Sequence, residues 1–104
     1  MSHFQISLFI GGKAYRMNVD RYYIGDFMDR YKVSAGEKEI QLESNIPEIE
    51  RTKAKKKADW KIVASNFDIG TSNDAALAIQ RLYREIEEEV LHSKKRYSDS
   101  NPNK

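Results

Sequence analysis

The residue types that most often carry metal or nucleophilic chemistry are scarce in this chain, which has two histidines and no cysteine. His92 follows Glu89 at the Glu-x-x-His spacing of paired di-metal sites, but such sites need two of these motifs and further carboxylates on other helices. His3 has no partner motif near it. The glutamates between Glu85 and Glu89 point in several directions around a helix. We therefore predict no metal site and interpret the glutamate run as a solvated face.

Neither Gly11-Gly12 nor Gly70-Thr71-Ser72 forms part of a nucleotide-binding loop sequence. Gly11-Gly12 is followed by Lys13, but the Gly-Lys-Ser/Thr ending is missing. Gly70-Thr71-Ser72 precedes a predicted helix and offers backbone donors to an anion, although an ordinary capped helix start accounts for the same residues. No serine stands in a motif for an activated nucleophile. We expect a protein that is not an enzyme and that needs no cofactor.

Arginine, lysine and aromatic residues recur at positions of the predicted strands that point away from the helix. Phosphates bind to Arg and Lys while bases stack on rings, so an open sheet face of this kind suits single-stranded nucleic acid. Five cations lie between Arg51 and Lys57 and add salt-dependent attraction if they lie on the same side. The candidate nucleic-acid-binding residues are Arg16, Tyr22, Arg30, Lys32, Lys55, Lys56, Lys57 and Lys61. Asp20 and Glu43 interrupt the face, so the alternative is a solvated surface with ordinary cross-strand charge pairs.

The outer side of the predicted C-terminal helix offers a second kind of surface. Leu77 and Leu91 fall opposite the apolar stripe of this helix and flank Arg84 at seven-residue spacing. Exposed apolar side chains can mark association surfaces. The alternative function is therefore a protein–protein interaction module or a homodimer that uses Leu77, Arg84 and Leu91 on the outer face of the helix, and the charged loop.

Length and composition set the class of protein. A chain of 104 residues with 39% hydrophobic and 33% charged residues suits one domain with one core, and a net charge of +2 demands no polyanionic partner. The apolar stretch from Phe4 to Ile10 has no basic segment before it and is too short for a signal peptide or a membrane span. We expect a cytoplasmic protein without a membrane partner, with one domain over residues 1–92 and a disordered polar tail over residues 93–104.

Alternating apolar residues predict two β-hairpins. A Gly11-Gly12 turn and a Gly36-Glu37 turn suit the positive φ angles of two-residue hairpin loops. The first turn pairs Leu8 with Tyr15, Ile6 with Met17 and Phe4 with Val19, and the second pairs Val33 with Ile40, Tyr31 with Leu42 and Arg30 with Glu43. A three-residue turn at Ile24-Gly25-Asp26 joins the hairpins and sets Val19 opposite Tyr31 and Met17 opposite Val33. The alternative is a loop or helical turn over Phe27 to Asp29.

One more strand and a long helix complete the predicted fold. Trp60, Ile62 and Ala64 share one side of a fifth strand. Residues 45–59 before it form a connection that can include a helical turn, and we expect the Arg51 to Lys57 cluster to be exposed and mobile. Apolar residues at helical spacing predict a helix over residues 72–91 that packs on one sheet face. The predicted core contains Ile6, Leu8, Met17, Val19, Val33, Ile40, Leu42, Trp60, Ile62, Ile79, Leu82 and Ile86.

The sequence thus predicts an α+β fold: an antiparallel β-meander of four or five strands with one long C-terminal helix packed on one face. This order of elements, over residues 4–91, resembles the repeat of PUR-type single-strand nucleic-acid-binding proteins. The resemblance is topological and assigns no residue a role, since a shared fold does not confer a function.

Overall fold

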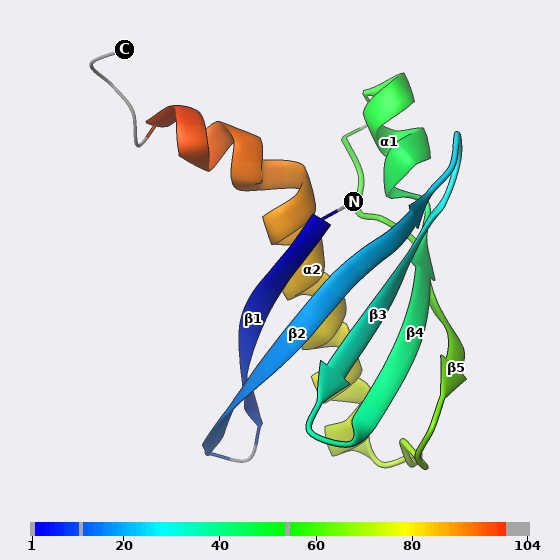
Figure 1. The fold of residues 1–104 in the computed structure, drawn as a ribbon, viewed down its shortest axis with the longest axis vertical. Coiled ribbons are helices and arrows are strands. Elements are labelled where there is room, and N and C mark those ends of the chain that lie inside the picture. Colours follow the sequence, from blue (N-terminus) through cyan, green and yellow to red (C-terminus); the bar gives the residue numbers. More distant parts are fainter. Residues whose placement is uncertain (1, 11, 54, 100–104) are drawn as a thin grey trace.

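The computed structural model describes residues 2–10, 12–53 and 55–99 and has one antiparallel sheet, whose five strands follow chain order, with a long helix across one face (Figure 1). The elements are β1 (Ser2–Ile10), β2 (Lys13–Ile24), β3 (Asp29–Ala35), β4 (Lys38–Ser44), α1 (Ile46–Thr52), β5 (Trp60–Ser65) and α2 (Asn73–Asp99). The predicted α+β class, the antiparallel meander and the C-terminal helix are confirmed.

Both predicted hairpin registers are confirmed. In the first hairpin Leu8 pairs with Tyr15 and Ile6 with Met17. In the second, β3 and β4 pair residue for residue as predicted, and Gly36 has the positive φ, 62°, that a Gly-first turn needs. Apolar side chains meet across each ladder, and a slip by one residue would turn them all to the other face. Residue 11, half of the predicted first turn, lies outside the described residues.

The predicted junction between the two hairpins is wrong by two residues. Val19 pairs with Val33 rather than with Tyr31, because the loop runs from Gly25 to Met28 and is closed by a hydrogen bond from the Gly25 N–H to the Met28 carbonyl (2.8 Å). Near the end of β2 the register shifts, and Tyr22 is the extra residue of a β-bulge. A shift of two residues keeps every side chain on its predicted face, so the apolar row survives.

Strand β5 lies at the sheet edge beside β4. Lys61 pairs with Glu43 and Ile62 with Leu42, and a bulge at Val63 then breaks the predicted alternation. Ile62 is exposed, which contradicts its predicted place in the core, and Trp60 is only partly buried. The residues of β5 are less buried than predicted because α2 has its main sheet contacts with β1, at the opposite edge of the sheet.

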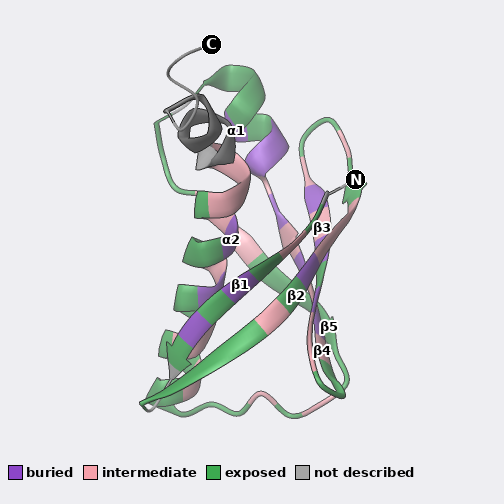
Figure 2. Ribbon diagram, turned by 60° about the vertical axis from the view of Figure 1, so that its left-hand side comes forward, coloured by how far each residue is buried: buried purple, intermediate pink, exposed green. Residues whose placement is uncertain are grey.

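The core lies between α2 and the inner sheet face, by which we mean the face toward α2. Buried positions alternate with exposed ones along β1 (Figure 2). Most of the predicted core is buried, whereas Met17 and Ile79 are partly buried. Three further apolar residues that the prediction omitted are buried: Tyr31, Ile46 and Ile49.

The segment predicted as a connection contains the short helix α1. Pro47 stands in its first turn, where a proline needs no N–H, and its neighbours Ile46 and Ile49 are buried. Lys53 ends the helix in the left-handed conformation. Asn45 and Asp59 then close the segment by mutual hydrogen bonds, including one from the Asp59 N–H to the Asn45 Oδ1 (2.8 Å).

Helix α2 begins as the sequence predicts. The Ser72 hydroxyl accepts a hydrogen bond from the Ala75 N–H (3.1 Å) and caps the first turn. The helix extends to Asp99, beyond the predicted end at residue 91, and the boundary of a disordered tail stays a prediction. Within the part of the chain that the structure describes, no helix combines the length and apolar character needed to cross a membrane.

Candidate functional site

Five of the eight candidate nucleic-acid-binding residues share the sheet face that points away from α2, here called the outer sheet face. Cross-strand partners point to the same side of an antiparallel sheet. The register therefore joins Arg30 with Glu43 and Lys61, and it joins Lys32 with Asp20. The five residues are Arg16, Tyr22, Arg30, Lys32 and Lys61.

Tyr22 lies across this face rather than standing out from it. Its hydroxyl donates a hydrogen bond to the Gln41 Oε1 (3.1 Å), which joins β2 to β4 over the intervening β3. The β-bulge at Tyr22 aims this side chain, because an extra residue redirects the strand locally. Gln41 is the cross-strand partner of Lys32, so the Tyr22 side chain crosses β3 near Lys32.

The cations of the outer sheet face differ in their partners. Arg30 and Lys61 each lie 3.3 Å from a carboxylate oxygen of Glu43, which neutralises part of their charge. Arg16 and Lys32 are exposed and form no ion pair with a described residue. The charges available to a ligand are therefore mainly those of Arg16 and Lys32.

A buried polar cluster at the β2–β3 end of the sheet was missed by the sequence analysis. The Asp29 carboxylate is fully buried and pairs with Arg21 at 2.8 Å. It also accepts hydrogen bonds from the hydroxyls of Tyr31 (2.6 Å) and Ser44. Burial, and then the Asp29 charge, raise the pKa of Tyr31 far above the usual tyrosine value. Asp29 stood in no predicted motif, so no sequence signal identified this cluster.

The same cluster anchors α1. The Ser44 hydroxyl accepts a hydrogen bond from the Ile46 N–H (3.2 Å), and Glu50 approaches the guanidinium of Arg21 to 4.0 Å. Every buried side-chain polar atom among the described residues has a hydrogen-bond partner. We conclude that the cluster fixes α1 relative to the sheet.

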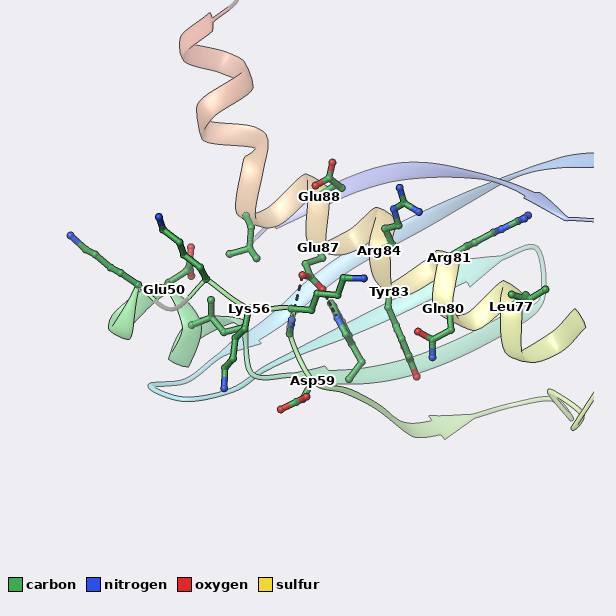
Figure 3. A pocket seen from close by; sticks show the side chains of 17 residues that line it. Glu50, Lys56, Asp59, Leu77, Gln80, Arg81, Tyr83, Arg84, Glu87 and Glu88 are labelled. Atoms are coloured by element: carbon green, nitrogen blue, oxygen red, sulfur yellow. Dashed lines mark hydrogen bonds between the residues drawn. The ribbon is translucent and has the colours of Figure 1, made fainter. Parts of the chain in front are cut away.

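The structure places Lys55, Lys56 and Lys57 away from the outer sheet face. They line an open groove of about 1390 Å³ together with the outer side of α2 (Figure 3). This groove, here called the α2 groove, also contains all three candidate interface residues, Leu77, Arg84 and Leu91. The lysines were predicted nucleic-acid-binding residues and also part of the alternative interaction surface, and the fold places them in one groove with the leucines.

Aromatic rings form the floor of the α2 groove. The ring of Trp60 stacks on that of Tyr83, with centroids 5.2 Å apart and planes inclined by 6°. Glu87 accepts hydrogen bonds from the Trp60 Nε1 (3.1 Å) and the Ala58 N–H (3.3 Å), which tie the start of β5 to α2 (Figure 3). Burial raises the pKa of Tyr83.

Metal chemistry finds no support in the described residues, among which no three His, Cys, Asp or Glu side chains gather as a metal site would require. The predicted absence of a metal site is not tested beyond them, because the His92 side chain lies outside the described part. Comparison of the chain with protein-family models, curated proteins and solved structures found no match. The outer sheet face and the α2 groove are the two candidate functional surfaces of the described residues.

Proposed function

We propose that this protein is a non-enzymatic binding module for single-stranded nucleic acid, with the outer sheet face as its binding surface. The observation that carries the proposal is the position of Tyr22, whose ring is held across β3 by Gln41. A ring that is already held in place loses little entropy when a base stacks on it. Stacking is sequence-tolerant because every base has a π face, so the expected ligand is a single strand of any sequence.

Electrostatic attraction supports nucleic-acid binding on the outer sheet face, and the small number of free cations limits the affinity. The free cations, Arg16 and Lys32, attract phosphates, whereas Arg30 and Lys61 share Glu43 and contribute less. For a single strand the logarithm of the binding constant falls with the logarithm of salt concentration by roughly 0.7 per neutralised phosphate. Two free cations predict a slope of about −1.4, and participation of all four would raise its magnitude to about 2.8.

Fluorescence anisotropy with a labelled single-stranded oligonucleotide tests the proposal. Replacing Arg16 and Lys32 by Gln should weaken binding and flatten the salt slope. The matched control replaces Lys55 and Lys56 by Gln, which removes the same charge from the α2 groove and should leave affinity nearly unchanged. The proposal fails if the wild-type protein does not bind at low salt, or if the control variant loses more affinity than the sheet variant.

A further inference from the structure

The α2 groove combines an apolar floor with a cationic wall. Trp60 and Tyr83 are only partly buried, and Leu77, at 56% exposure, lies further along α2 in the same groove (Figure 3). Leu91 and Ile49 close the end near α1. Large apolar side chains gathered on one surface are typical of a protein-interaction site rather than of a solvated helix face.

The opposite wall carries exposed positive charge. Lys55, Lys56 and Lys57 are exposed, and none of them pairs with a described carboxylate. Hydrogen bonds hold the segment at its end, where Asp59 binds Asn45 and the Ala58 N–H binds Glu87. The lysines are therefore presented beside the aromatic floor, on the side of the molecule opposite the outer sheet face.

The size and the charge of the α2 groove indicate which class of molecule binds there. At about 1390 Å³ and open to solvent, the groove is larger than the roughly 300 to 1,000 Å³ of a typical small-molecule site. The cations of the lining, Lys53, Lys55, Lys56, Lys57, Arg81 and Arg84, outnumber its carboxylates, Glu50, Asp59, Glu87 and Glu88. The carboxylates interrupt the cationic surface, which disfavours a ligand with an unbroken row of negative charges such as a phosphate backbone. A polypeptide can instead alternate its charges with apolar side chains, and so can match lysines on one wall and rings on the floor.

We propose that the α2 groove binds an acidic, amphipathic segment of a partner protein. Its carboxylates pair with Lys55, Lys56 and Lys57, and its leucine-like side chains pack on Trp60, Tyr83 and Leu77. This is the helix-in-groove mode of peptide recognition, with charge complementarity setting which segments bind. The inference is independent of nucleic-acid binding, because it uses the opposite side of the sheet.

Intrinsic fluorescence gives a direct test, because Trp60 is the only tryptophan in the chain and lies in the groove. The probe is a helix-forming peptide of about 14 residues, roughly four turns, with leucines at heptad a and d positions and glutamates at most others. A saturable blue shift of Trp60 emission is expected. Two control peptides, one with lysines for the glutamates and one with serines for the leucines, should cause no saturable shift.

Variants separate the two parts of the site. Replacing Lys55, Lys56 and Lys57 by Gln should weaken peptide binding by about tenfold at low salt, since each exposed ion pair contributes modestly. Leu77→Ser should weaken it by a similar factor, while the Arg16→Gln and Lys32→Gln double variant should bind as wild type does. If the outer sheet face does not bind nucleic acid, these results are unaffected.

Three outcomes would overturn the inference. The first is the absence of any fluorescence change with the acidic peptide. The second is an equal response to a single-stranded oligonucleotide, which would make the groove a nucleic-acid site. The third is a concentration-dependent dimer in sedimentation analysis that Leu77→Ser abolishes and that excludes the peptide, which would make a second copy of this chain the occupant.

Discussion

The hydroxyl of Tyr22 donates a hydrogen bond to the side-chain oxygen of Gln41, 3.1 Å away, so that a residue of β4 holds a ring of β2 across β3. This relationship depends on the β-bulge, because Tyr22 is the residue without a cross-strand partner. Without the bulge, the side chain at this position would follow the regular alternation of the strand and project away from the sheet. Here it lies on the sheet and presents an aromatic surface beside Lys32.

Tyr22 should dominate the affinity for single strands. Tyr22→Leu removes the ring and should weaken oligonucleotide binding by about tenfold or more, because stacking of one base on an aromatic ring contributes roughly 1 to 3 kcal/mol. Tyr22→Phe keeps the ring and loses only the hydrogen bond to Gln41, so its loss should be much smaller. Anisotropy titrations compare the two variants. Equal losses would mean that the hydroxyl, not the ring, is what matters.

The buried ion pair should be the most sensitive polar feature of the fold. Asp29→Asn leaves Arg21, whose side chain is 11% exposed, without a charged partner, and such losses typically cost about 3 to 5 kcal/mol. Lys61→Gln is the matched control, because its ion pair is solvent-exposed and contributes at most about 1 kcal/mol. Urea denaturation measures both. A loss below 1 kcal/mol for Asp29→Asn would contradict the assigned anchoring role.

Two leucines of α2 provide a test of the core. Leu82 is buried against the sheet, so Leu82→Ala should lower the free energy of unfolding by about 2 to 5 kcal/mol. Leu77 is exposed, and Leu77→Ala should change the free energy of unfolding by less than about 0.5 kcal/mol. The same denaturation experiment distinguishes them. Similar effects at the two positions would mean that α2 packs with a different face.

Alkaline pH should destabilise the fold through Tyr31. Its pKa in the folded protein is raised by burial, so above pH 10 the unfolded chain releases a proton that the folded protein retains. The stability contribution is complete below pH 10 and falls by about 1.4 kcal/mol per pH unit above it. Tyr31→Phe should reduce this slope; Tyr83, whose pKa burial also raises, contributes part of the remainder. An unchanged slope in Tyr31→Phe would contradict the assignment.

Local patterns predicted the hairpins because turn chemistry and cross-strand pairing act over few residues. Leu8 and Tyr15, or Val33 and Ile40, are brought together by a two-residue turn that fixes the register. The junction between the hairpins escaped prediction, since a longer loop and a bulge at Tyr22 permit several registers with the same buried face.

The surfaces were predicted less completely than the fold. Alternation correctly placed Arg16 and Lys32 on one face, because side-chain direction follows strand parity. The α2 groove could not be predicted, since it depends on where α1 docks and how the segment after it returns to Trp60. That return is fixed by tertiary hydrogen bonds to Glu87, which lies 27 residues after Trp60 and has no local signature.

A heteronuclear NMR titration with an unlabelled single-stranded oligonucleotide tests the central claim most directly. The account predicts saturable shifts of the backbone amides of Arg16, Tyr22 and Lys32 and of the Gln41 side-chain amide, whose oxygen holds the Tyr22 hydroxyl. The single indole N–H resonance, that of Trp60, reports on the α2 groove and should stay in place. Shifts confined to Trp60 and Lys55 to Lys57, or no shifts at low salt, would contradict nucleic-acid binding on the outer sheet face.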